Sequence, residues 1–341
     1  MLLTLVLIGA AALSISMIYR VFGDEGKLFT FDFFTPATLT AILGLLLVYF
    51  ALDSLRFYCV LRTLGHKLPF WYIVKLSFIN IFVSTITPFA TGGGFAQIYF
   101  LTKAGVPMGR ATAATSIRTL LSVVFFIVAL PFVLLINPAM LNTLLEGGFL
   151  WILIITLTIY IVIVVGLLRV VSNERWVKRT VLRFLRFLRR RGIISPRTMR
   201  RTYLRLTGEV RHFNSGIRLF AGGSKKFLAF SVLCTGLFLL AMFSFSVLLI
   251  HAMGYDVSPG YIYQMQVLIN FIMYFALTPG ATVIAEGGFA LMLSGHVEGN
   301  IPLLTLMWRL FTVYAGTVIG MVVFYIEMYS VSRKKKERRN G

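Results

Sequence analysis

Cysteine, histidine and acidic residues are scarce in this chain of 341 residues, which has 2 Cys, 4 His and 12 Asp plus Glu. Cys59 and Cys234 cannot build a disulfide framework and lack metal-ligand spacing, so we expect inert thiols in the apolar core. The sequence has no H-E-x-x-H, G-x-S-x-G, P-loop or Rossmann motif. These absences argue against an enzyme acting on a soluble substrate, and we expect no metal and no cofactor.

Apolar residues are abundant instead: they make up 58% of the chain, and the mean hydropathy is +0.86. Several continuous apolar runs reach the ~20 residues that a helix needs to cross a bilayer. The predicted fold class is therefore an all-α polytopic membrane protein. Six full spans are predicted, at Leu2–Tyr19, Ala37–Leu55, Ala113–Ile136, Phe149–Leu168, Phe227–Ile250 and Leu303–Tyr329. Two Gly/Pro-broken regions, Trp71–Leu101 and Ile262–Leu293, are predicted to be re-entrant hairpins.

The charges divide between the two sides of this arrangement. If each hairpin enters and leaves on one side, nearly all of the 33 Lys and Arg fall on the same face. Such an excess marks the cytoplasmic side, so both termini are predicted to be cytoplasmic. Hairpin legs that cross fully would leave this topology unchanged.

The chain also contains an internal duplication. Thr87-Pro88-Phe89-Ala90-Thr91 nearly matches Thr278-Pro279-Gly280-Ala281-Thr282. Each string has an Asn upstream, a Gly-Gly-Phe-Ala downstream and an intramembrane Arg beyond it. The predicted units, within one membrane domain of residues 1–341, are repeat 1 (37–136) and repeat 2 (227–329). A basic cytoplasmic loop (169–226) joins them, and a basic tail (330–341) follows. The charges give the two units opposite orientations, as in the inverted repeats of transporters.

Intramembrane charges are the candidate site residues, because such groups are costly and usually functional. Arg118 and Arg309 are predicted to hold a lipid phosphate near the inner and outer surfaces. The alternative is that each pairs with a carboxylate or helix-end carbonyls, or reaches its interface. Glu286, expected in the turn of the second hairpin, is a candidate counter-charge for a cationic headgroup, or a partner of an Arg. Asp53 is either a second counter-charge for the cationic headgroup or a member of a surface i,i+3 pair with Arg56.

The hairpins supply the remaining candidates. Asn80 and Asn270 are candidates for lipid binding, with hydrogen bonding across the hairpin legs as the favoured role. The lipid-binding candidates also include one threonine from each string, Thr87 and Thr278. The expected hinges of the hairpins are Pro88, Gly92, Gly93, Pro279, Gly287 and Gly288.

The long basic loop contains an amphipathic stretch, Arg175–Arg191. Its apolar face is Val177, Val181, Phe184, Leu185 and Leu188, and most of its basic residues lie opposite. The pattern is typical of a helix lying on an anionic membrane surface, or of charge that only sets topology. No folded recognition module surrounds it, so we expect no nucleic-acid partner.

The two hairpin motifs, the Gly105-Val106-Pro107 stretch and Arg309 resemble the lysylphosphatidylglycerol synthase transmembrane domain over nearly the whole chain. This domain is similar to the N-terminal flippase part of the multiple peptide resistance factor (MprF) proteins. In that family a separate cytosolic domain transfers lysine to phosphatidylglycerol. The membrane domain then moves the lysyl lipid to the outer leaflet, which gives resistance to cationic antimicrobial peptides.

The resemblance implies a flippase of the bacterial cell membrane, with Asp53, Arg118 and Glu286 at positions that matter for translocation. Its partners would be lysyl-phosphatidylglycerol and phosphatidylglycerol, with a homodimer and a separate synthase left open. The chain ends at Gly341, with no room for a transferase domain, so we expect a translocase and not an enzyme. The alternatives are the membrane part of a lysyltransferase system, a flippase or scramblase for another lipid, and a scaffold with a basic loop.

Overall fold

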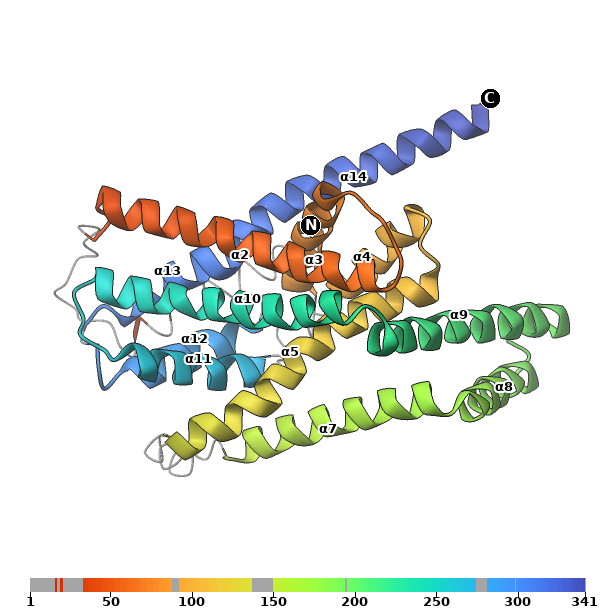
Figure 1. Cartoon of the computed structure of the whole chain (residues 1–341), viewed down its shortest axis with the longest axis horizontal. Coiled ribbons are helices and arrows are strands. Elements are labelled where there is room, and N and C mark those ends of the chain that lie inside the picture. Colours follow the sequence, from red (N-terminus) through yellow and green to blue (C-terminus); the bar gives the residue numbers. More distant parts are fainter. Residues whose placement is uncertain are drawn as a thin grey trace.

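The structure is a computed structural model, and every regular element in the part that it describes is a helix (Figure 1). It describes residues 16, 19–20, 33–87, 92–136, 150–193, 195–273, 281–297 and 299–340. The first predicted span, Leu2–Tyr19, and the residues Pro88, Thr278 and Pro279 lie largely or wholly outside these ranges. Five described helices are long and apolar enough to cross a membrane. The fold class of an all-helical, multi-pass membrane protein is thereby confirmed.

The five long helices match the predicted spans, with some ends moved. They are α2 (Pro36–Thr63), α5 (Met108–Ile136), α7 (Leu150–Ser172), α10 (Lys225–Ala252) and the run of α13 (Ile301–Arg309) into α14 (Ala315–Asn340). Helix α14 continues past its predicted end at Tyr329, and α2 continues to Thr63, well beyond its predicted end at Leu55. The prediction for α2 stopped before the first basic residue, Arg56, but a helix continues through a charge whose side chain finds partners. Helix α2 ends at Thr63, and Gly65, two residues beyond, has a φ of +81° that suits glycine.

The two predicted hairpins are pairs of shorter helices, α3 (Phe70–Ile86) with α4 (Gly92–Lys103), and α11 (Pro259–Met273) with α12 (Thr282–Leu293). Legs of 12 to 17 residues span roughly 18–26 Å at 1.5 Å per residue. This is less than the ~30 Å of hydrocarbon in a bilayer. The leg lengths therefore favour hairpins that turn back inside the membrane.

Both hairpins are closed by a matching tyrosine bond. The Tyr72 hydroxyl, on the third residue of α3, donates to the Phe100 carbonyl near the end of α4 at 2.9 Å. The Tyr261 hydroxyl, on the third residue of α11, donates to the Met292 carbonyl near the end of α12 at 2.8 Å. The internal duplication in the sequence thus corresponds to the same contact at the open end of each hairpin.

The two units pack across each other. Helix α2 lies beside α10, α3 runs along α14, and α11 contacts α5. The α3–α14 contact is close because Gly316 and Gly320 of α14 face Ile81 and the Phe78 backbone of α3. One apolar core joins α10 to α13 with α2 and α5, and a second lies among α2 to α5 and α9. In Figure 1, α2 ends and α5 begins toward the end of the molecule near α9, whereas α10 ends and α13 begins at the opposite end.

The predicted basic loop consists of two helices, α8 (Glu174–Arg190) and α9 (Pro196–Gly222). Helix α9 packs on the beginning of α5, where the Gly109 N–H donates to the Glu209 carboxylate at 2.7 Å. A side chain at Gly109 or Gly216 would collide with the facing helix. The small residues therefore hold α9 against the first unit.

Candidate functional site: two buried arginine–carboxylate centres

The described residues contain two buried centres in which arginine meets a carboxylate. The Asp53 centre consists of Asp53, Arg56 and Arg118. The Glu286 centre consists of Glu286 and Arg309. All five side chains are buried, and Glu286 is fully so. An ion pair inside a membrane domain is costly to desolvate, so its retention here points to a role of these groups.

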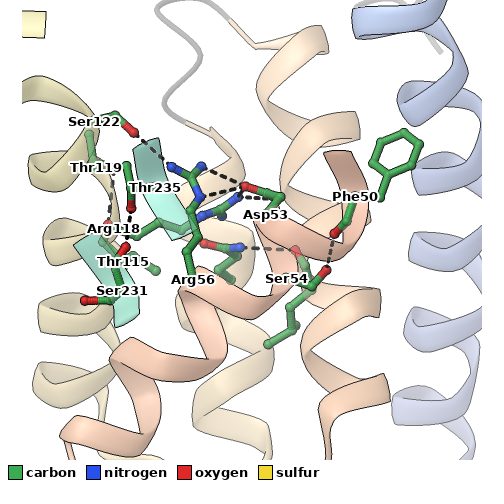
Figure 2. A network of polar contacts seen from close by, with 12 residues as sticks. Phe50, Asp53, Ser54, Arg56, Thr115, Arg118, Thr119, Ser122, Ser231 and Thr235 are labelled. Atoms are coloured by element: carbon green, nitrogen blue, oxygen red, sulfur yellow. Dashed lines mark hydrogen bonds and ion pairs between the residues drawn. The ribbon is translucent and has the colours of Figure 1, made fainter. Parts of the chain in front are cut away.

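Asp53 contacts both arginines of its centre (Figure 2). The Arg118 Nη2 atom, reaching from α5, lies 2.7 Å from Asp53 Oδ1 and 2.6 Å from Oδ2. Arg56, one turn along α2, donates from Nε to Oδ1 at 2.9 Å, and its Nη2 lies 2.7 Å from the same oxygen. The predicted i,i+3 pair of Asp53 and Arg56 therefore exists. It is not a surface pair, because α2 runs on past it and α5 and α10 cover it.

Arg56 was expected just beyond the second predicted span, Ala37–Leu55, on the cytoplasmic side, but it lies within α2. Its Nη1 donates to the Ser122 hydroxyl of α5 at 2.9 Å, and its guanidinium carbon lies 3.9 Å above the centre of the Phe238 ring of α10. A guanidinium over an aromatic face is stabilised by the ring quadrupole, more so where water is excluded. Arg56 therefore links three helices around Asp53 and is part of the site.

The Glu286 centre joins the second hairpin to the last span. Arg309 Nε, at the end of α13, lies 3.4 Å from Glu286 Oε1 of α12. The Tyr314 hydroxyl lies 3.4 Å from the same oxygen. Next to the pair, Trp308 stacks on Phe289 with ring centres 4.4 Å apart. A π-helical turn, Leu310–Tyr314, follows Arg309 directly, and such turns often occur at functional sites.

Glu286 was expected in the turn of the second hairpin, with Gly287 and Gly288 as hinges, and this was wrong. All three residues lie within α12. The chain enters α12 through Ala281, whose φ of +56° is left-handed and unusual for a residue with a Cβ. A pair of glycines bends the chain only where the residues on either side do not form a helix. In α12, Gly288 faces Ile269 of α11, whereas Gly287 has open space around it.

The Thr87 hydroxyl links the two legs of the first hairpin. Thr87 Oγ1 donates to the Val83 carbonyl at 2.7 Å and accepts from the Gly92 N–H at 3.0 Å. Gly92 is the first residue of α4, and Gly93 leaves no room for a Cβ against Asn80 and Ser84 of α3. Thr87 is thus a cap of α4, and the two glycines permit close approach of the legs.

The amide bonds across the legs come from residues other than those expected. The Asn80 side chain has no hydrogen-bond partner among the described residues. Gln97 of α4 donates instead to the Leu76 carbonyl of α3 at 3.2 Å. Asn270 bonds one turn back in its own helix, to the carbonyl and the side-chain oxygen of Gln266, both at 2.9 Å. Gln266 in turn donates to Ser246 of α10 at 2.5 Å, so this amide network ties α11 to α10.

The sequence therefore missed Arg56, Gln97 and Gln266 as buried polar residues. Gln97 and Gln266 could have been found, because each is an uncharged polar residue inside an apolar hairpin helix. Arg56 had no such signal, since a basic residue at the end of an apolar run looks like an ordinary interfacial charge.

The guanidinium groups of both centres are suited to binding an anion. Guanidinium groups bind phosphate oxygens in the fork geometry that they use for carboxylates. Across the described residues no group of three or more His, Cys, Asp and Glu is placed to hold a metal ion. Cys59 and Cys234 are both free and buried, as predicted.

Comparison with known proteins agrees with these observations. The family model of the lysylphosphatidylglycerol synthase TM region matches residues 7–320. A UPF0104 membrane protein of Archaeoglobus fulgidus is 25% identical over 275 residues, which make up 80% of this chain and 81% of that protein. The match covers both hairpins and both buried centres, so the chain belongs to the family of the lysylphosphatidylglycerol synthase TM region.

Proposed function

We propose that this protein is a phospholipid flippase that moves lysyl-phosphatidylglycerol from the inner to the outer leaflet of the bacterial cell membrane. Both termini are cytoplasmic in this proposal, and the outer lysyl lipid contributes to resistance against cationic antimicrobial peptides. The observation that carries it is the presence of a buried arginine–carboxylate centre in each of the two duplicated units. The family membership supports the lipid class.

The chemistry of the centres supports an exchange mechanism. A phosphate diester presents two oxygens, as a carboxylate does, and can take the place of Asp53 on Arg118. The released carboxylate then balances an ammonium group of the lysyl headgroup. The same exchange at Arg309 and Glu286 serves the second unit. Because each guanidinium and each carboxylate keeps a partner of opposite charge, the costly state of an unpaired buried charge is avoided.

The test is transport by the purified full chain in liposomes. A fluorescent lysyl-phosphatidylglycerol analogue is placed in both leaflets, and a membrane-impermeant quencher measures the fraction that reaches the outside. We expect transport by the wild type, and a reduction of ~10-fold or more in Arg118→Gln and in Glu286→Gln, because each loses a charge-assisted contact. Arg62→Gln is the matched control, since Arg62 lies on α2 outside the Asp53 centre and stacks on Tyr58.

Three outcomes of this transport assay distinguish a flippase with these residue roles from the alternatives. Full transport in both variants would refute the residue roles. Transport of phosphatidylcholine and phosphatidylglycerol at equal rates, without net direction, would show a scramblase. No movement of any phospholipid would refute the function itself.

The family description names a synthase, which favours a second candidate: the membrane part of a lysyltransferase system. In this reading the chain performs no reaction alone and acts with a separate synthase. Co-purification of lysyltransferase activity with the tagged chain, together with absence of transport, would support it.

A further inference from the structure

Helix α8 begins at a sharp change of direction where the chain leaves a membrane span. Helix α7 ends at Ser172, and Asn173 has φ −129° and ψ 76°, outside the helical region. The Asn173 side chain accepts the Trp176 N–H at 2.9 Å and so caps α8. Figure 1 shows α8 turned away from the line of α7. Since α7 is an apolar span, α8 starts close to the surface of the bilayer.

Only part of the predicted apolar face of α8 is free. Val177 and Leu185 are buried where α8 packs against its neighbours, α9 and α7. Phe184, predicted to share that face, is 59% exposed. The apolar face predicted from residue spacing is wide. The neighbouring helices α9 and α7 cover the side of it that holds Val177 and Leu185 and leave Phe184 uncovered.

Phe184 belongs instead to an exposed aromatic strip beside the covered face. The strip consists of Trp176, Phe184 and Phe187, which are 44%, 59% and 51% exposed, with Thr180 between them. These positions lie on one side of a helix, because 176, 180, 184 and 187 follow its i, i+4 and i+3 spacing. Three exposed aromatic side chains in one strip on a short helix indicate a surface that binds something apolar.

A row of arginines borders the strip. Arg179, Arg183, Arg186 and Arg190 follow the same helical spacing and line a depression of about 410 Å³ together with Phe187 and Leu182. Like charges at this spacing repel one another. The one acidic residue of α8, Glu174, pairs with Lys178 at 2.7 Å, away from the row. Negative charge that would neutralise the arginine row must therefore come from a group outside α8.

We propose that the aromatic strip and the arginine row of α8 together bind anionic phospholipids in the leaflet from which α7 emerges. The aromatic rings insert at the level of the headgroups, and the arginines bind the lipid phosphates beside them. Both features lie next to each other on one helix, and that helix starts at the end of a membrane span. A soluble acidic partner would match the arginines but not the adjoining aromatic strip.

The test measures where the strip lies in membranes of two compositions. The full chain, with Cys59→Ala and Cys234→Ala, carries one spin label at Thr180→Cys, inside the strip but leaving its aromatics intact. A second version carries the label at Arg189→Cys, on the opposite side of α8. Each is placed in phosphatidylcholine vesicles with or without phosphatidylglycerol. Collisions with oxygen, which enters lipid, are compared with collisions with a water-soluble nickel complex.

We expect the label at residue 180 to contact lipid in vesicles with phosphatidylglycerol, and the label at residue 189 to stay in water. Replacing the four arginines of the row by glutamine should lower the ratio of lipid-bound to free α8 by ~10-fold or more. The matched control removes four exposed arginines from α9 instead, with Arg197, Arg200, Arg201 and Arg205 changed to glutamine, and should change little.

The proposal is overturned if residue 180 remains in water in anionic vesicles, or if the two quadruple variants behave alike. A label that leaves water only when a soluble acidic protein is added would overturn it as well, in favour of that partner.

Discussion

Replacing Asp53 should destabilise the protein more than replacing either arginine that it binds. Asp53 is 2% exposed, and both arginines contact it at 2.6 to 2.9 Å. Asp53→Asn leaves two buried guanidinium groups facing a neutral amide, and breaking a buried pair in this way costs about 3–5 kcal/mol. Arg118→Gln leaves Asp53 with Arg56, so its expected cost is only about 1–2 kcal/mol.

The free energy of unfolding is measured by titrating the protein from mild detergent micelles into sodium dodecyl sulfate and following helix loss by circular dichroism. Asp256→Asn is the matched control. It makes the same chemical change at an exposed residue and should stay within about 0.5 kcal/mol of wild type.

The order of the two variants is the critical result. If Asp53→Asn is as stable as wild type, or if Arg118→Gln is the less stable of the two, Asp53 is not the shared partner of both arginines. Arg118→Gln should meanwhile lose transport while it keeps most of its stability. Loss of both together would mean that Arg118 is structural.

Further outcomes are expected at other sites. Glu286→Gln removes the carboxylate next to buried Arg309 and should cost about 3 kcal/mol in the same titration, with partial recovery when Arg309→Gln is added. Gly320→Val should cost at least ~2 kcal/mol because its side chain collides with the α3 backbone, whereas Gly44→Val, with open space around it, should not. Burial lowers the pKa of His66 from its ordinary 6.5, so the folded state favours the neutral ring. Stability should therefore fall as the pH drops below about 6.5, and His66→Gln should abolish this fall.

Hydrophobicity and periodicity are local properties, and they accounted for most of the secondary structure. Continuous apolar runs must form helices in a bilayer, because backbone groups there need internal partners. The hairpin helices and the helical character of the basic segment followed in the same way. The errors occurred where a local signal had two meanings. Gly287 and Gly288 indicated a turn but lie within a helix, and Arg56 indicated an interface but lies in a buried centre.

The sequence by itself determined the membrane class, the helices, the duplication and the choice of Arg118, Arg309, Glu286 and Asp53 as candidates, because each depends on spacing along the chain. Only the tertiary structure decided their partners. Asp53 and Arg118 are 65 residues apart, and Arg309 meets a carboxylate from another helix. Which charges meet depends on how α2, α5, α12 and α13 rotate and cross. Packing of the whole bundle sets these angles, and the spacing of residues within one helix does not.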